Sequence, residues 1–347
     1  MSFRVVCSAL VMGFALSGTA FAQSAPLTTT EAMIPSSDPG VKLYIRNKHA
    51  EDMTSFSPDR TLLFIHGATY PAETSFDLPI DGVSMMDLFA RNGFDVYLVD
   101  VRSYGRSSRP PEMDQPPEAN KPIATSEEAD ADLGAAVDYI LAQRAIPKLD
   151  LMGWSWGTSI AGAYTASHND KINRLVLYAP AWISQPPVEP STNALPAYRL
   201  VERDSAKHRW LRGVPEDKQA TLIPPGVFDQ WWNATLATDP VGSKMDPPKL
   251  RAGNGVRAEF ANYWMAGKPF YDPGQITVPT LLIHAEWDAD LPSYMAYAYF
   301  AKLTGVPYKR FVELGEGTHT VMLEKNRMQF FHEILGFLDK SDATALK

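Results

Sequence analysis

The chain has 347 residues, enough for one large domain or for a domain with an inserted subdomain. Its composition of 45% hydrophobic, 11% aromatic and 21% charged residues is that of an ordinary globular protein rather than a disordered one. Acidic residues outnumber lysines and arginines by 40 to 32, a net charge of −8, which repels nucleic acid and anionic membrane surfaces and excludes a nucleic-acid-binding role.

Residues 1–22 have the pattern of a cleavable secretory signal peptide. Arg4 gives the start a positive charge, the residues after it are apolar or small, and Ala20-Phe21-Ala22 forms a cleavage site before Gln23. The apolar run is too short to span a bilayer comfortably, so we expect cleavage rather than a retained anchor. We therefore expect a secreted or periplasmic protein without a stable membrane anchor.

The only cysteine, Cys7, lies inside this signal and does not follow the small residues of a lipoprotein cleavage site. The mature chain then has no thiol, which excludes disulfides, cysteine catalysis and thiolate metal sites. Removal of Arg4 with the signal leaves 31 basic and 40 acidic residues, a net charge near −9. Because no phosphate-binding loop, metal-ligand cluster or dinucleotide motif is present, we expect neither a metal nor a cofactor.

Residues 23–40 are rich in Thr, Ser and Pro and are expected to form an arm, after which the chain alternates between β-prone runs and helix-like segments. The β-prone runs are 61–65, 94–99, 149–152 and 175–178, and the helix-like segments between them are 83–92, 126–143 and 158–168. The helix-like segment 126–143 has a clear start signal: Ser126 as its cap, and Glu127 and Glu128 in its first turn. Strands that alternate with helices predict an α/β fold with a mostly parallel, doubly wound sheet.

The alternation stops at Ala181. Residues 182–272 are rich in Pro, Trp and charge and show no clear strand, which predicts a mainly helical cap inserted into the fold. Beyond it follow a strand over 280–284, a helix over 293–303, a strand over 308–314 and a terminal helix over 324–339. We therefore assign residues 41–181 and 273–347 to one α/β core and residues 182–272 to the cap.

The segment Gly153-Trp154-Ser155-Trp156-Gly157 stands between an apolar strand and a helix and has the form G-x-S-x-G. A serine on so tight a strand-to-helix turn projects its hydroxyl above the sheet, and the glycines give the room that a close approach of strand and helix requires. The helix N-terminus adds N–H donors and a positive dipole end where an oxyanion would form. The alternative, a turn with a capping serine, explains this context less well, so we interpret Ser155 as a nucleophile.

Two further motifs accompany this turn. His66-Gly67-Ala68 follows the run at 61–65, and Asp100-Val101-Arg102-Ser103-Tyr104-Gly105 follows the run at 94–99. Together the three motifs resemble the α/β-hydrolase superfamily over nearly the whole mature chain, although the superfamily has glycine where this chain has Ser103. The resemblance implies an oxyanion hole made by the backbone N–H groups of Ala68 and Trp156, and a structural role for His66.

The resemblance also implies the other two members of a catalytic triad. Of seven histidines, His319 alone lies in a glycine-rich loop after the last predicted strand, the position of the superfamily's catalytic base. The superfamily usually places its acid four residues before a proline, which selects Asp288, with Asp290 and Glu286 as alternatives. The triad Ser155, Asp288 and His319 then has the superfamily's order along the chain.

Aromatic residues lie close to these motifs or in the predicted cap. The candidates for substrate binding are Tyr70, Trp154, Trp287, Trp231 and Trp232. They either line an apolar pocket for the acyl or leaving group or simply pack the cap onto the core, and we give the two interpretations equal weight. We expect an ester or amide with a bulky apolar or aromatic part. Residues 182–270 carry 11 basic and 9 acidic residues, which is also compatible with a carboxylate-bearing substrate.

The sequence therefore predicts a hydrolase of small-molecule carboxylic esters that works through an acyl-enzyme. The same triad in a different pocket would serve an amidase, a peptidase or a carbon–carbon bond hydrolase. A ligand-binding sensor with a nearly inert site is the alternative from another class, and the complete triad argues against it. No feature of the sequence predicts an oligomeric state.

Overall fold

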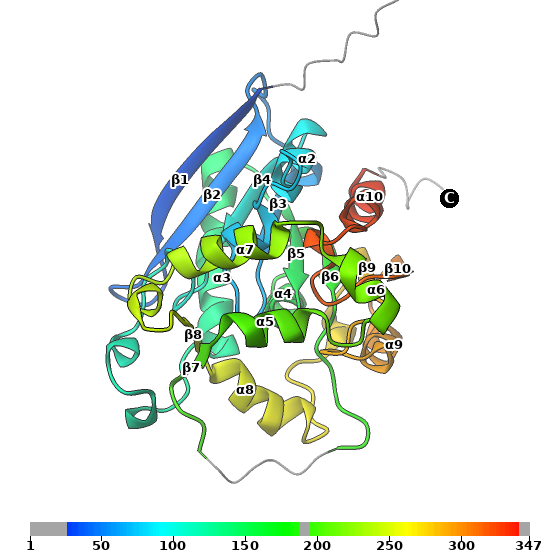
Figure 1. The fold of residues 1–347 in the computed structure, drawn as a ribbon. Coiled ribbons are helices and arrows are strands. Elements are labelled where there is room, and N and C mark those ends of the chain that lie inside the picture. Colours follow the sequence, from blue (N-terminus) through cyan, green and yellow to red (C-terminus); the bar gives the residue numbers. More distant parts are fainter. Residues whose placement is uncertain (1–25, 188–193, 340–347) are drawn as a thin grey trace, which may run out of the picture.

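The structure is a computed structural model that describes residues 26–187 and 194–339, so the predicted signal peptide lies outside the described residues. The strands of the main sheet are β1 (Leu27–Pro35), β2 (Lys42–Ala50), β3 (Thr61–Ile65), β4 (Asp95–Val99), β5 (Leu149–Trp154), β6 (Ile172–Tyr178), β9 (Thr280–Ala285) and β10 (Lys309–Leu314). Their spatial order is β1-β2-β4-β3-β5-β6-β9-β10 (Figure 1). All neighbours from β4 to β10 pair in parallel, and β1 and β2 form an antiparallel edge.

Helices pack against this sheet. They are α1 (Ala72–Phe76), α2 (Met85–Arg91), α3 (Ser126–Arg144), α4 (Trp156–Ser167), α9 (Ser293–Lys302) and α10 (Arg327–Leu338). The helices α3 and α4 pack on each other, α4 contacts β5 and β6, α2 contacts β2 and β4, and α10 contacts β10. This mostly parallel sheet with its helices confirms the predicted α/β fold class.

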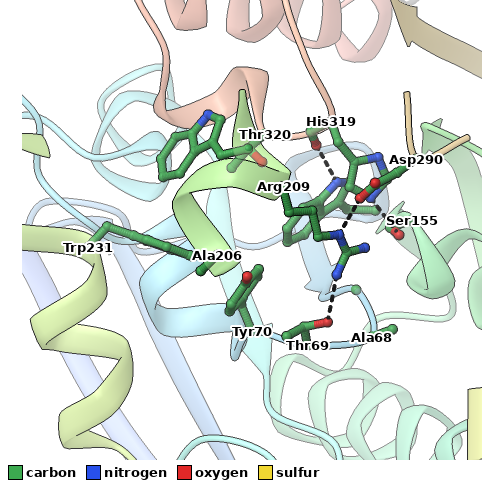
Figure 2. Close-up of a pocket in the computed structure, with 13 residues that line it drawn as sticks. Ala68, Thr69, Tyr70, Ser155, Ala206, Arg209, Trp231, Asp290, His319 and Thr320 are labelled. Carbon is green, nitrogen blue, oxygen red and sulfur yellow. Dashed lines mark hydrogen bonds and ion pairs between the residues drawn. The ribbon is translucent and has the colours of Figure 1, made fainter. Parts of the chain in front are cut away.

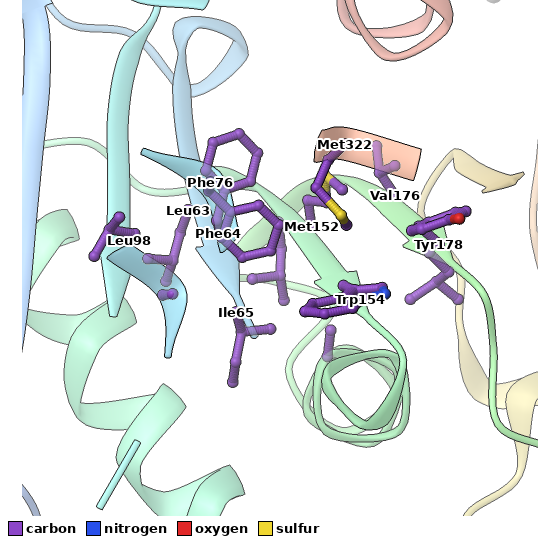
Figure 3. Close-up of a cluster of buried hydrophobic side chains, with 14 of the residues drawn as sticks. Leu63, Phe64, Ile65, Phe76, Leu98, Met152, Trp154, Val176, Tyr178 and Met322 are labelled. Atoms are coloured by element: carbon purple, nitrogen blue, oxygen red, sulfur yellow. The ribbon is translucent and has the colours of Figure 1, made fainter. Parts of the chain in front are cut away.

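The central strands are mostly apolar, and neither of their faces meets water. Every residue of β3, β4 and β5 is buried, as is typical of parallel strands that helices cover on both sides. Figure 3 shows Phe64, Met152 and Val176 from three adjacent strands lying together with Phe76 of α1 and Met322. This packing fixes the end of the strand from which the predicted nucleophile emerges.

The start of α3 differs by one residue from the prediction. The cap is Thr125 and not Ser126: the Thr125 hydroxyl accepts a hydrogen bond from the Glu128 N–H at 3.2 Å, and the Glu128 carboxylate accepts one from the Thr125 N–H at 2.8 Å. Because this reciprocal arrangement needs a glutamate three residues after the cap, Glu128 selects Thr125.

The segment expected as an arm contributes a strand. Its residues 27–35 form β1, which pairs with β2 along its whole length, from Leu27 opposite Ala50 to Pro35 opposite Lys42. The β-branched threonines that made the segment resemble a linker also favour extended structure, and only pairing with β2 decides between the two. The expectation of an arm was therefore wrong for these residues.

Between β6 and β9 the chain leaves the main sheet. This stretch, which we call the inserted segment (residues 182–272), contains α5 (Arg203–Trp210), α6 (Glu216–Leu222), α7 (Val227–Ala237), α8 (Gly255–Glu259), β7 (Tyr198–Val201) and β8 (Leu250–Gly253). Figure 1 shows these helices as a group beside the main sheet. The strands β7 and β8 form a small antiparallel sheet of their own, which the sequence did not predict. Each is only four residues long and its partner is far away in the chain, so no local alternation marks them.

Candidate active site

Ser155 lies at the sharp turn between β5 and α4. Its φ of 57° and ψ of −122° are rarely adopted by residues other than glycine, and such backbone strain is concentrated at functional sites. A Cβ on Gly153 would come within 2.2 Å of the Gly157 carbonyl oxygen, and a Cβ on Gly157 within 2.6 Å of the His66 carbonyl oxygen. The turn therefore depends on both glycines of the motif.

Ser155, His319 and Asp288 form one chain of hydrogen bonds. Ser155 Oγ lies 2.8 Å from His319 Nε2, and His319 Nδ1 lies 2.7 Å from Asp288 Oδ2; Figure 2 shows the serine beside the histidine ring. Because an ionised carboxylate can only accept, Nδ1 carries the imidazole proton and Nε2 accepts from the serine hydroxyl. His319 thus has the tautomer that can remove a proton from Ser155.

Asp288 is the only one of the three candidate acids that contacts His319. It is almost fully buried, and its second oxygen, Oδ1, accepts the backbone N–H groups of Asp290 at 2.9 Å and Leu291 at 3.0 Å. Asp290 instead binds arginines of the inserted segment, and Glu286 is exposed. These hydrogen bonds orient the Asp288 carboxylate toward the imidazole.

The loop that carries His319 is held from two sides. Trp154 Nε1 donates to the His319 carbonyl oxygen at 2.8 Å, and the two rings are 5.5 Å apart. On the other side the fully buried Glu324 accepts from the Thr318 N–H at 3.0 Å and from Trp210 Nε1 at 2.8 Å. Burial raises the pKa of Glu324 to about 7. Glu324 therefore connects the histidine loop to α5 of the inserted segment.

The loop after β3 packs directly on Ser155. A Cβ on Gly67 would come 3.0 Å from Ser155 Cβ, and the carbonyl oxygen of the next residue, Ala68, accepts from the Tyr104 hydroxyl at 2.8 Å. Trp156 is the first residue of α4, so its N–H has no acceptor in a preceding turn of the helix. The two N–H groups implied as an oxyanion hole therefore belong to segments that adjoin the serine.

His66 is buried between the loops after β3 and β4. Its Nδ1 lies 2.7 Å from the Gly67 carbonyl oxygen, and its Nε2 accepts from the Val101 N–H at 3.1 Å. Burial lowers the pKa of His66 to about 4, so the ring is neutral near pH 7. These bonds connect two loops without involving Ser155, in keeping with a structural role.

Ser155 borders two cavities. The first, which we call the aromatic cavity, is lined by Tyr70, Trp154, Trp210 and Trp231 and has a volume of about 20 Å³, room for roughly one water molecule. The Tyr70 and Trp231 rings meet edge to face at 4.5 Å. Of the five aromatic residues expected to bind substrate, Tyr70, Trp154 and Trp231 lie here.

The structure brings Trp232 and Trp287 to neither cavity. Trp232 is buried in the packing of α7, with its ring 6.2 Å from that of Trp231. Consecutive positions on a helix point to different faces, so only one of these two neighbours can face Ser155. Trp287 is half-buried, and its backbone N–H donates to the Gly317 carbonyl oxygen at 2.9 Å.

The second cavity, which we call the large cavity, has a volume of about 570 Å³ and is also lined by Ser155 and His319. Val256 and Phe260 are among the apolar residues of its wall. Apart from His319, its ionisable residues are Asp290 and four arginines, which we call the arginine cluster: Arg199, Arg209, Arg212 and Arg257. Sequence reasoning missed all four, and the only signal for them was the modest excess of basic residues in the inserted segment.

Two arginines share one carboxylate in the cavity walls that Ser155 also lines. Arg209 Nε donates to Asp290 at 2.6 Å, and its Nη1 donates to the Thr69 hydroxyl at 3.3 Å, so that in Figure 2 its side chain lies between these two residues. Arg212 also forms an ion pair with Asp290. These contacts connect α5 and the residues after it to the loop that carries Asp288.

Two further sets of contacts connect the inserted segment to the residues around Ser155. Arg199 donates to the Ala68 carbonyl oxygen at 2.9 Å and to the Thr69 hydroxyl at 2.7 Å. Glu259 of α8 accepts from the N–H of Ser126 at 2.6 Å and from its hydroxyl, which in turn accepts from Trp156 Nε1 at 2.7 Å. The indole of Trp156 therefore points toward the start of α3.

Over the described ranges, 26–187 and 194–339, no three His, Cys, Asp or Glu side chains are grouped so that they could hold a metal ion. In the same ranges no helix combines the length and the apolar character needed to cross a membrane.

A family model described as the alpha/beta hydrolase fold matches residues 60–326. An esterase from Thermogutta terrifontis, solved with malate bound, has a TM-score of 0.56 at 18% identity, with 90% of this chain and 98% of that one covered. A serine hydrolase involved in carbazole degradation has a TM-score of 0.60 at 16% identity, with 90% of this chain and 99% of that one covered. A meta-cleavage product hydrolase from Pseudomonas fluorescens IP01 has a TM-score of 0.58 at 13% identity, with 90% and 98% covered. No curated protein matches the sequence.

Proposed function

Because the chain belongs to the alpha/beta hydrolase fold family, we propose that it is a serine hydrolase that cleaves a carboxylic ester, with Ser155 as its nucleophile. The family and the esterases and serine hydrolases among its structural neighbours support hydrolase activity in general. The observation that carries the specific proposal is the chain of hydrogen bonds from Ser155 through His319 to Asp288.

In the first half of the proposed reaction, Ser155 Oγ attacks the ester carbonyl carbon while His319 Nε2 takes the hydroxyl proton. Asp288 holds the imidazole in the required tautomer and stabilises the imidazolium that forms. The N–H groups of Ala68 and Trp156 are proposed to donate to the oxyanion, and loss of one such donor costs a factor of about 10² to 10³ in rate.

In the second half, the imidazolium of His319 gives its proton to the departing alcohol, which leaves an acyl group on Ser155. A water molecule, deprotonated by His319, attacks this acyl-enzyme, and collapse of the second tetrahedral intermediate releases the acid and restores the serine hydroxyl. Every proton removed in one step is returned in a later one, so the cycle needs only water as co-substrate.

The two cavities support a division of the substrate into a small and a large part. The aromatic cavity, at about 20 Å³, has room for roughly a methyl-sized group beside Ser155. The large cavity, at about 570 Å³, has space for the bulky apolar or aromatic group that we propose, against Val256 and Phe260. A series of esters with lengthening acyl chains tests this part, because steadily falling activity without any preference for aromatic groups would refute it.

The central test compares the parent protein with its Ser155→Ala variant on p-nitrophenyl acetate and butyrate. We expect the variant to lose a factor of about 10⁴ or more in kcat, and a fluorophosphonate probe to label Ser155 in the parent only. Equal hydrolysis by both proteins would refute the proposal, and a folded parent that takes no label would favour a ligand-binding module. Amides with matched acyl groups separate an esterase from an amidase.

We further propose that residues 1–22 direct export and are then removed, which rests on the charge, the apolar run and the Ala20-Phe21-Ala22 site. N-terminal sequencing of protein recovered from the periplasm or the medium should find Gln23 first. Recovery of the chain with Met1 in place would refute cleavage.

A further inference from the structure

The wall of the large cavity has far more positive than negative charge. Its four arginines face a single aspartate outside the triad, Asp290, which pairs with Arg209 and Arg212. Within the part of the chain that the structure describes, Arg199 and Arg257 have no carboxylate partner. The chain as a whole has a net charge of −8, so the wall of the large cavity is positively charged in a protein that is negatively charged overall.

The members of the arginine cluster are close enough to repel one another. Burial lowers the pKa of Arg199, and so do the positive charges of Arg209 and Arg257. Burial likewise lowers the pKa of Arg212, and Arg209 adds to this effect. Like charges that gather in a partly desolvated wall raise the free energy of the empty site, and an anion placed among them would offset this cost.

Structural roles account for only part of the cluster. Arg199 supports the loop after β3 through Ala68 and Thr69, and Arg209 and Arg212 bind Asp290. Arg257, by contrast, is an exposed residue of α8 that lines the large cavity. No contact among the described residues explains why a positive charge is needed there.

We infer that the ester cleaved at Ser155 carries a carboxylate, which binds in the large cavity against the arginine cluster. This inference rests on the proposed function. Ser155 and His319 line the same cavity as the four arginines, so one molecule can place its carbonyl at the nucleophile and its carboxylate among the guanidinium groups. Guanidinium groups present paired N–H donors that match the two oxygens of a carboxylate. Val256 and Phe260 of the same wall would contact the apolar chain between the two ends.

The test uses two esters with the same scissile bond. One is mono-p-nitrophenyl adipate, which has a free carboxylate, and the other is its neutral methyl ester, methyl p-nitrophenyl adipate. For the purified full chain we expect kcat/KM to be about tenfold higher for the carboxylate, since each tenfold corresponds to about 1.4 kcal/mol of binding. Added salt should lower this preference, because it screens the arginines. Hydrolysis by the Ser155→Ala protein is subtracted as background.

Arg257→Gln tests the arginine assignment. We expect it to lower the preference, taken as the ratio of the two kcat/KM values within one variant, by about fivefold, as for a well-placed exposed ion pair. Arg257→Lys should keep most of the preference because the charge stays. The matched control is Arg203→Gln, which removes the same charge from α5 at an exposed residue that pairs with Asp229 and lines neither cavity. Its ratio should equal that of the parent.

The possible failures are distinguishable. Equal kcat/KM for the two esters, or a higher value for the neutral one, would overturn the inference and leave the proposed function standing. A preference that Arg257→Gln leaves intact, or that Arg203→Gln lowers equally, would overturn the assignment to the arginine cluster. If neither ester is hydrolysed and a fluorophosphonate does not label Ser155, the proposed function fails. The ratio of the two kcat/KM values measured on one variant does not depend on how much of that variant is folded. Thermal melts of each variant would record any change in the folded fraction.

Discussion

Replacement of Asp288 by asparagine tests whether this residue orients the imidazole of His319. Asparagine has nearly the same shape as aspartate, so the packing stays the same and only the hydrogen bonding changes. In the structure Oδ1 of Asp288 accepts two backbone N–H groups and Oδ2 accepts His319 Nδ1. An amide has one accepting oxygen and one donating nitrogen. If its oxygen keeps the two backbone N–H groups, its NH₂ group faces Nδ1 and forces the imidazole proton onto Nε2, next to Ser155.

The opposite orientation of the amide keeps the right tautomer but is unfavourable. It would place the NH₂ group against the N–H groups of Asp290 and Leu291, which would both be left without an acceptor in a buried place. Each unsatisfied buried donor costs about 1–3 kcal/mol. The wrong tautomer should therefore predominate, and we expect kcat to fall by a factor of about 10⁴, equivalent to about 5 kcal/mol.

The assay is steady-state hydrolysis of p-nitrophenyl butyrate near pH 7, with thermal melts to confirm folding. Asp290→Asn is the control, because Asp290 lies two residues away and pairs with Arg209 and Arg212 instead of His319. It should cost less than about tenfold in kcat, the range for ion pairs whose arginine side chains stay half exposed to water. If Asp288→Asn keeps kcat within tenfold of the parent, or if Asp290→Asn is the more damaging change, the acid has been assigned to the wrong residue.

Three further predictions concern the surroundings of the triad. Because burial raises the pKa of Glu324 from the ordinary 4.5 to about 7, the folded state keeps a proton that the unfolded chain loses, so stability falls between these pH values. Glu324 contributes about 2 kcal/mol to the fall between pH 5 and pH 7.5, so urea unfolding should show a fall smaller by that amount in Glu324→Gln; equal falls in both proteins would contradict the argument. Gly157→Ala should lower Tm by several degrees or prevent folding, because its Cβ would lie within 2.7 Å of two backbone carbonyl oxygens. The control is Gly336→Ala in α10, where the new Cβ has open space and should stabilise the protein by about 0.5–1 kcal/mol. Arg199→Met should lower kcat for a neutral ester by about tenfold with little change in KM, since the Ala68 loop loses a donor; an unchanged kcat would show that the loop holds its place without it.

Ser155 and His319, two of the three residues in the hydrogen-bonded chain, were predictable because each is marked by its immediate neighbours in the sequence. Ser155 stands between glycines at a strand-to-helix turn, and His319 follows the last strand in a glycine-rich loop. The selection of Asp288 needed the superfamily's spacing, since Asp290 and Glu286 are also carboxylic acids in the same loop. Only the contact with His319 distinguishes them, and the sequence does not contain that contact.

The walls of the two cavities were much less predictable. Which of Trp231 and Trp232 faces Ser155 depends on how α7 is rotated against the core, and the arginine cluster depends on how the inserted segment folds over it. The strand β1 was missed for a related reason, because an edge strand of threonines becomes distinct from a linker only through its pairing with β2. Local patterns specify turns and strand ends, whereas these features require long-range packing.

The hydrogen bonds from Glu259 to Ser126 and from Ser126 to Trp156 make the inserted segment a poor unit for exchange between enzymes. A chimaera that received this segment from another hydrolase without the Glu259 carboxylate would keep the Ser126 N–H at the start of α3 without its buried acceptor. It would also lose the group that orients the Ser126 hydroxyl toward the indole of Trp156. Each missing partner costs about 1–3 kcal/mol. Exchange of the inserted segment should therefore include residues 126 and 156 of the core together with the segment itself.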